Sequence, residues 1–296
     1  MPGADDVESF LDPSAELALD HPSAAHVAKA CKQMRAVGAG ALNETKKVCA
    51  GGDGDACADL AALAICGGSM ETNEAAALAT LERSCALGSS DGCHFFASAL
   101  IAGNLGKRDV GRGMRVHRRA CSNGSARACG SLGSVLVGIG KPGAVARGLS
   151  YLEEACSGGY LDSCGAIAMV EASGIGSRAK NAERAVGIAR DACEKGNALS
   201  CGVLGALKVR GLGTAKDEAS GAKLLARACN AGEASGCTNL GICHYNGTGV
   251  SRDVNKATEL LERGCGGGNR QACAILADIA SAPQASAPSM ASTPFF

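Results

Sequence analysis

The amino-acid sequence predicts an all-α protein: an α/α solenoid of about seven helix pairs of roughly 36 residues each, wound as a right-handed superhelix. Two cysteines in C-x7-C spacing recur seven times, and successive pairs follow one another at 36, 36, 35, 37, 36 and 36 residues. Every pair also has a glycine three residues after its first cysteine. A period of roughly 20 to 50 residues is typical of a stacked repeat array.

The first helix of each unit, helix A, is predicted to begin just before the second cysteine and to run for about three turns. Four residues past that cysteine the side chain is always small, and a small residue also precedes the first cysteine of pairs two to seven by eight positions, inside the second helix, helix B. Small side chains at fixed register let two helices approach closely. The residues are Ala61, Ala97, Gly133, Ala168, Gly205, Gly241 and Ala277 in helix A, and Ala77, Gly113, Gly148, Ala185, Gly221 and Ala257 in helix B.

Glycines and polar caps mark where these helices begin and end. Helix A is expected to stop at glycine turns such as Gly174–Gly176, Gly211–Gly213 and Gly247–Gly249, because glycine readily adopts positive φ. Helix B is expected to begin twelve residues before the next cysteine, where Asn or Asp can cap a first turn. The caps are Asn73, Asp109, Asn181, Asp217 and Asp253; the third repeat has Ala144 there and is one residue shorter.

The run LGICHYNGTGVSRDVNKATELLERGC (Leu240–Cys265) resembles the Sel-1-like repeat, an α/α relative of the tetratricopeptide repeat. The frame C-x2-G-x4-C is similar to its cysteine-rich bacterial branch, the Helicobacter cysteine-rich proteins. The resemblance covers about Cys49 to Ala280. One departure is the family's tyrosine in helix A, which this sequence replaces with Leu100, Glu171, Lys208 or His244.

The resemblance implies one disulfide within each C-x7-C pair, at every repeat junction. The predicted helices agree, because a tight hairpin can bring the end of helix B beside the first turn of the next helix A. Each such link contributes about 2–3 kcal/mol in the chain-entropy model. A metal site would need closer ligand spacing, and no thioredoxin-like C-x-x-C occurs. The predicted disulfide cysteines are Cys49, Cys57, Cys85, Cys93, Cys121, Cys129, Cys156, Cys164, Cys193, Cys201, Cys229, Cys237, Cys265 and Cys273.

Three cysteines stand outside these pairs: Cys31, Cys66 and Cys243. Cys66 and Cys243 fall within predicted helices A, where we expect small buried side chains; a reactive thiol is the alternative.

Composition and the two chain ends indicate which partners are unfavoured and how the chain is organised. The 29 Lys and Arg balance 29 Asp and Glu, so no bulk charge favours nucleic acid, and no apolar run reaches the roughly 18 residues of a membrane span. We expect a monomer with an acidic mobile segment at 1–21, a repeat array with capping helices at 22–280 and a disordered Pro/Ser/Ala tail at 281–296.

The cysteines favour an oxidising compartment, periplasmic or secreted, although the N-terminus lacks the pattern of a signal peptide. An export signal outside this sequence would reconcile the two observations. The alternative is a cytoplasmic protein with reduced cysteines.

Catalytic patterns are weak. The resemblance implies penicillin binding and weak β-lactamase activity, and two S-x-x-K matches begin at Ser177 and Ser220, but neither has an S-D-N or K-T-G companion. Gly138–Gly143 spells G-x-G-x-x-G in a predicted turn between helices, not after a strand. The histidines show no metal-ligand spacing. We therefore expect no metal and no cofactor.

The function predicted is a non-enzymatic scaffold that binds a protein or peptide on its concave face. The alternatives are a β-lactam- or cell-wall-binding protein with weak hydrolase activity and a thiol-active assembly factor. By tetratricopeptide-like geometry, helix A lines the concave face. The expected contact residues are His94, Ser98, Ile101, Val137, Met169, Val209, Ile242 and Tyr245.

A second surface is a basic stripe on one helix B, spaced i, i+4, i+7, i+11 and thickened by Lys107, His117 and Arg118. It is a solvated face or a dock for an acidic partner. The stripe consists of Arg108, Arg112, Arg115 and Arg119.

Overall fold

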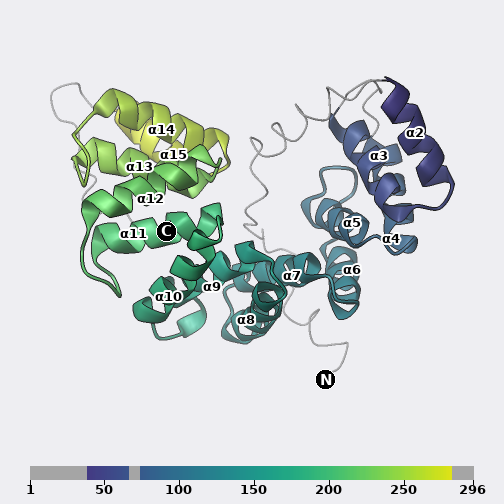
Figure 1. Ribbon diagram of the computed structural model, residues 1–296, viewed down its shortest axis with the longest axis horizontal. Helices are drawn as coiled ribbons and strands as arrows, with labels where there is room; N and C mark the ends of the chain where they lie inside the picture. The colour runs from purple at the N-terminus through teal and green to yellow at the C-terminus, as the bar shows by residue number, and fades with distance from the viewer. Residues whose placement is uncertain (1–38, 67–73, 282–296) are drawn as a thin grey trace. The chain divides into compact units, whose positions relative to one another are not determined.

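The computed structural model describes residues 39–66 and 74–281, and within them it contains fourteen α-helices, one short 3-10 turn and no strand (Figure 1). The all-α prediction is confirmed. The described chain divides into two compact units, one ending at Tyr160 and the other beginning at Leu161. The predicted segment 1–21 and Cys31 lie outside the described residues, as does the predicted tail apart from Ser281, which ends the last helix.

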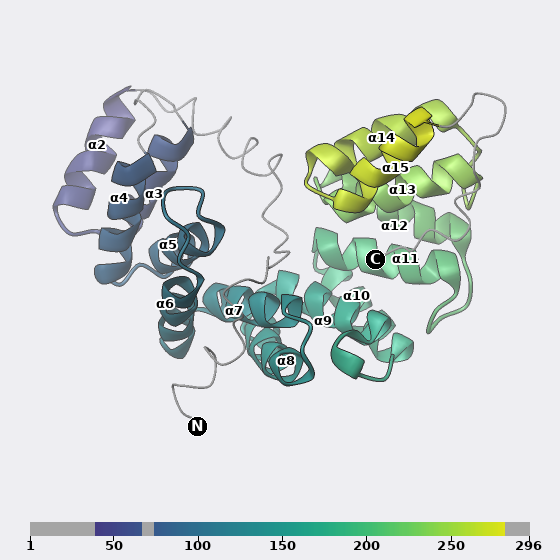
Figure 2. The ribbon, with the colours of Figure 1, turned by 180° about the vertical axis from the view of Figure 1, so that it is seen from behind.

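Each unit alternates helices A and B, as Figures 1 and 2 show from opposite sides. In the first unit the helices A are α3 (Gly54–Cys66), α5 (Ser90–Ala102) and α7 (Ala126–Gly138), and the helices B are α2 (Ala39–Ala50), α4 (Glu74–Ala86), α6 (Val110–Ser122) and α8 (Pro142–Ser157). In the second unit the helices A are α9 (Leu161–Ser173), α11 (Ala198–Arg210), α13 (Ala234–Asn246) and α15 (Arg270–Ser281), and the helices B are α10 (Ala182–Glu194), α12 (Glu218–Asn230) and α14 (Val254–Gly266). The 3-10 turn η3 is Ile175–Ser177.

The small residues of helices A and B face each other within a repeat. A Cβ atom placed on Gly133 would lie 2.7 Å from the carbonyl oxygen of Gly148, and one on Gly205 would lie 2.9 Å from that of Gly221. Both distances are shorter than side-chain contacts allow, so these helices pack backbone against backbone. The predicted close approach is confirmed.

The predicted caps bind the first turns of helices B. The side chains of Asp109, Asn181, Asp217 and Asp253 accept hydrogen bonds from the backbone N–H three residues later at 2.8, 3.0, 3.0 and 2.9 Å. Asn73 lies outside the described residues. In the third repeat α8 starts earlier, at Pro142, so Ala144 lies inside the helix; proline suits a first helical position because it has no N–H to leave unpaired.

The same caps also close the turn between helix A and helix B, at the four positions where the side chains of helix A differ. The backbone N–H of each cap donates to a carbonyl oxygen near the end of the preceding helix A, at 2.8 to 2.9 Å. The acceptor is a backbone oxygen, so the bond can form whichever side chain the acceptor residue carries. The four acceptors are Leu100, Glu171, Lys208 and His244.

Disulfides join helix B to the next helix A. Six C-x7-C pairs are bonded with Cα–Cα distances of 4.2 to 4.8 Å, and Cys156 and Cys164 are disulfide-bonded as well. The glycine inside every pair has φ between 89° and 100°, which favours glycine. One disulfide per repeat junction is therefore confirmed.

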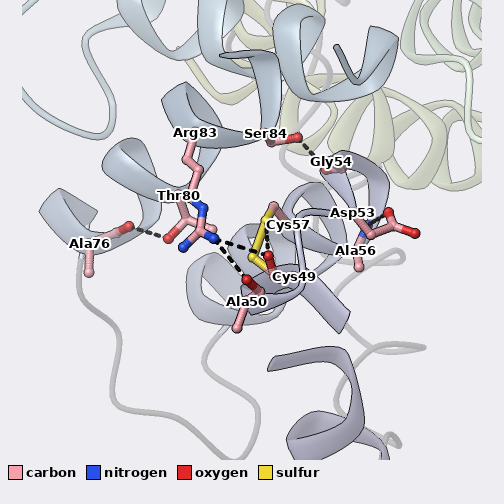
Figure 3. Close-up of a disulfide and its surroundings, with 10 residues drawn as sticks. All are labelled: Cys49, Ala50, Asp53, Gly54, Ala56, Cys57, Ala76, Thr80, Arg83 and Ser84. Atoms are coloured by element: carbon pink, nitrogen blue, oxygen red, sulfur yellow. Dashed lines mark hydrogen bonds between the residues drawn. A yellow bond between two sulfur atoms is a disulfide. The ribbon is translucent and has the colours of Figure 1, made fainter. Parts of the chain in front are cut away.

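Arginines from the following repeat cover several of these junctions. Figure 3 shows Arg83 of α4 reaching the Cys49–Cys57 disulfide, where its Nη2 donates to the carbonyl oxygens of Cys49 and Ala50 at 3.3 Å each. Arg263 of α14 donates in the same way to the carbonyl of Cys229 at 3.1 Å. The carbonyls of Cys49 and Cys229 already accept from the N–H groups of Gly52 and Gly232, so each guanidinium adds a second hydrogen bond that ties the following repeat to the junction.

Candidate partner-binding surface

The helices A of successive repeats lie side by side within each unit. In the first unit α3 contacts α5 and α5 contacts α7; in the second α9 contacts α11 and α11 contacts α13. Successive helices B contact each other less closely. The helices A therefore form the inner face of each unit, where repeat arrays present their extended surfaces.

The most exposed side chains on this face in the first unit stand two positions before and two positions after the second cysteine. They include Asp55 and Asp59 on α3, and Asp91 and Phe95 on α5. Phe95 is 40% exposed, which is unusual for an aromatic side chain in a protein with few of them. Exposed apolar and acidic groups thus occur together.

A groove of about 270 Å³ lies between α3 and α5 on this face. Its lining combines three carboxylates with one aromatic ring and two small side chains. We call it the α3–α5 groove; it is lined by Asp55, Ala58, Asp59, Ser90, Asp91 and Phe95.

The carboxylates of the α3–α5 groove differ in their partners. Asp55 accepts a hydrogen bond from Ser89 Oγ at 2.6 Å, and Asp91 pairs with Arg127 at 3.1 Å. Among the described residues no hydrogen bond or ion pair reaches Asp59. Partial burial raises the pKa of the Asp59 carboxyl, and the neighbouring negative charges raise it further. The groove therefore has an excess of negative charge that a cation would relieve.

Four of the predicted contact residues are in the core, which corrects the sequence-based interpretation. Ile101, Val209 and Tyr245, eight positions after the second cysteine, are 3 to 4% exposed, and Ile242 is fully buried. Tyr245 and Ile242 pack in one cluster that includes Leu261 of α14. The eighth position faces neighbouring helices because helix A is covered on two sides.

The other four predicted contact residues are half-buried: His94, Ser98, Val137 and Met169. His94 is mostly covered, and its Nδ1 lies 3.1 Å from Ser131 Oγ. Whether any of the four touches a partner stays a prediction.

The basic stripe is shorter than its spacing suggested. Arg108 precedes α6, and its Nε donates to the carbonyl of Ile101 at 3.0 Å, so it closes the turn after α5. Arg252 does the same for Tyr245 at 3.0 Å in the second unit. Arg112 pairs with Glu82, and its guanidinium carbon lies 5.1 Å from the centre of the Phe96 ring.

Arg115 and Arg119 remain exposed on α6, with Lys107 beside the turn and Arg118 half-buried. His117 was expected to thicken the stripe, but it is 1% exposed and lies in the interior. His117 stands between Val116 and Arg118, so the sequence around it does not show that its side chain faces the interior.

The residues considered for chemistry do not form a catalytic group in the described chain. Ser177 ends the η3 turn and Ser220 lies in the first turn of α12, so the two S-x-x-K matches occupy unlike environments. Gly138–Gly143 spans the turn between α7 and α8, as predicted. Cys243 is buried and unpaired, and burial raises the pKa of its thiol to about 12, which keeps it protonated and poorly nucleophilic. The side chain of Cys66 lies outside the described residues.

Among the residues that the structure describes, one group of side chains has the spacing of a metal site. Cys121, Cys129 and Glu154 lie close together, but the two sulfur atoms form a disulfide and cannot both act as thiolate ligands. Within residues 39–66 and 74–281, no helix is long and apolar enough to cross a membrane.

Comparison with known proteins agrees with this fold. The family described as Sel1 repeat matches residues 126–160, 199–233 and 234–269. These three segments of the chain therefore match the Sel1 repeat, the class of α/α unit that the sequence resembles. No curated protein sequence matches it.

Two solved structures provide similar folds at low sequence identity, and a third matches over a shorter stretch. A Sel1 repeat protein from Oxalobacter formigenes is 18% identical, with a TM-score of 0.64 over 81% of this chain and 97% of that one. A protective antigen of uropathogenic Escherichia coli with an SLR fold is 21% identical, with a TM-score of 0.56 over 80% of this chain; this chain spans 51% of the antigen's length. Helicobacter pylori cysteine rich protein B is 27% identical over 42% of this chain, with a TM-score of 0.35.

Proposed function

We propose that this protein is a disulfide-stapled scaffold that binds a partner protein on the face formed by its helices A, with the α3–α5 groove as the anchoring site. The observation that carries the proposal is an exposed aromatic ring at the edge of a groove that also holds three carboxylates. Exposed apolar groups rimmed by polar ones mark interaction sites.

The chemistry of the groove favours a partner segment that presents lysine or arginine. The aliphatic part of such a side chain can lie against Phe95 while its charged end approaches Asp59. A cation over an aromatic face gains about 0.5–1 kcal/mol at an exposed site, and a charge-assisted hydrogen bond to a carboxylate adds to it. An acidic segment would instead meet the negative groove and be repelled.

Rigid junctions suit this role. The disulfides flanking α3 and α5 fix each helix to the one before it, so the groove is formed before the partner arrives. A preorganised surface loses less conformational entropy on binding. The same disulfides support an oxidising, extracytoplasmic location, because they do not persist in a reducing cytosol.

The proposal is tested by capturing partners on immobilised protein from an extract of the source cells, under non-reducing conditions. Phe95→Ala and Asp59→Asn should each lose proteins that the wild type retains. Leu87→Ala is the matched control, because Leu87 is a large apolar side chain, 43% exposed, outside the groove. Partners retained equally by Phe95→Ala and Leu87→Ala would show that the groove is not the site.

A further inference from the structure

Two histidines of the first unit lie close together, one fully buried and the other half-buried. His94 of α5 and His117 of α6 have ring centroids 5.6 Å apart, and His94 Nδ1 lies 3.1 Å from Ser131 Oγ on α7. His117 is 1% exposed, and its Nδ1 has no hydrogen-bond partner among the described residues. The pair therefore links three consecutive helices without any carboxylate to stabilise a positive charge on His117.

The surroundings hold both imidazoles neutral. Burial and, to a smaller extent, the neighbouring His94 together lower the pKa of His117 to about 3. Burial also lowers the pKa of His94 to about 4, with Arg127 of α7 as the second cause. The charged groups that act on the pair are thus Arg127 and, through its ion pair with Arg127, Asp91 of α5.

We infer that His94 and His117 form an acid-sensitive latch, which fastens α5, α6 and α7 together when both rings are neutral and loosens these helices when either ring takes up a proton. A buried imidazolium beside a second imidazole and an arginine has no counter-charge in the interior, so the protonated form is favoured only when the helices separate and admit water. The inference goes beyond the proposed function and does not depend on it.

The direction of the effect follows from the two protonation states. Both pKa values lie below the usual histidine value of 6.5, so the stabilisation is fully present above about pH 6.5 and is lost as the pH falls towards 4. Between pH 7.5 and 5.0, each histidine should raise the equilibrium constant for local opening roughly 30-fold.

The loosening should stay local. A repeat array can open in part because each repeat contacts only its neighbours. The disulfides Cys85–Cys93 and Cys121–Cys129 keep the helix ends tethered, so α5, α6 and α7 can separate without the chain unravelling. In the second unit, His244 is half-buried and contacts the carbonyl of Ser251 at 3.3 Å, so that unit has no equivalent buried pair among its described residues.

Hydrogen exchange read by mass spectrometry at pH 7.5, 6.0 and 5.0, corrected for the intrinsic exchange rate, tests the latch on the full-length oxidised protein. Protection of α5 to α7 should fall by at least 30-fold from pH 7.5 to 5.0, while protection of α13 and α14 changes much less. His117→Leu, which removes the unpaired nitrogen and nearly preserves volume, should reduce that fall by a factor of roughly 30, which is the contribution of the histidine removed, and so should His94→Gln.

His244→Gln is the control and should behave as wild type. If His117→Leu does not fold at pH 7.5, His94→Gln alone decides the question, because its ring is less buried. An equal loss of protection in both units, or an unchanged loss in the folded histidine variants, would overturn the inference.

Discussion

Replacing Gly221 with alanine should destabilise the second unit, although alanine is the better helix former. A Cβ atom at this position would lie 2.6 Å from Val209 Cγ2 and 2.8 Å from the carbonyl oxygen of Gly205. The valine methyl can move, but the carbonyl belongs to the facing helix, so α11 and α12 must separate slightly. Overpacking of this kind costs about 1–3 kcal/mol, and the gain in helix propensity offsets up to about 1 kcal/mol of it.

We therefore expect a net loss of about 1–2 kcal/mol in the free energy of unfolding for Gly221→Ala. Gly187→Ala is a matched control in the same unit, because Gly187 lies inside α10 and a Cβ there would meet no atom within 4 Å. That variant should gain about 0.5–1 kcal/mol.

Urea unfolding of the oxidised proteins, followed by circular dichroism at 222 nm, measures both variants. The midpoint should move down for Gly221→Ala and up for Gly187→Ala. If Gly221→Ala is as stable as the wild type, close packing of the two helices is not what requires glycine at this register.

Three other predictions follow from the disulfides, the serines and the basic stripe. Complete reduction should lower the melting temperature sharply, since each short staple contributes about 2–3 kcal/mol; an unchanged melting curve would contradict this. Ser177→Ala and Ser220→Ala should leave any penicillin turnover unaltered, and a variant that folds but loses turnover would identify a catalytic serine. Arg115→Glu with Arg119→Glu should shift stability by under about 1 kcal/mol and leave partner capture intact, whereas salt-sensitive loss of a partner would point to the stripe instead of the groove.

The repeat architecture could be predicted from the sequence because one physical requirement recurs at a fixed interval. Each junction needs a positive φ three residues after its first cysteine, and only glycine meets it without strain. The close approach of helices A and B likewise needs small residues at one register, such as Gly133 and Gly148. Backbone demands of this kind are visible in a single sequence.

The surface was harder to predict because helix A has neighbours on more than one side. Counting positions from the cysteine placed Tyr245 and Ile242 on an open face, yet these side chains pack against the following repeat. The predicted basic stripe was wrong at Arg108 for another reason. The regular spacing of arginines extends beyond the N-terminal end of α6, and the Arg108 side chain there closes the turn after α5.

The α3–α5 groove was missed even though its signal was present. Asp55 and Asp59 stand four positions apart on one helix and Asp91 and Phe95 repeat that spacing on another, at equal distances from their cysteines. Two helices with matching register lie side by side in an array, so these four residues could have been assembled into one patch. What the sequence does not contain is the depth of the groove between them.

The most direct test of partner binding on the inner face is site-specific photo-crosslinking in the oxidised protein. A photoreactive phenylalanine analogue replaces Phe95 in one variant and Arg115 in another, and both are irradiated in an extract of the source cells. We predict a discrete crosslinked species from position 95, with the partner peptide carrying lysine or arginine near the attachment point, and none from position 115. A discrete product from position 115 with none from position 95 would contradict the account.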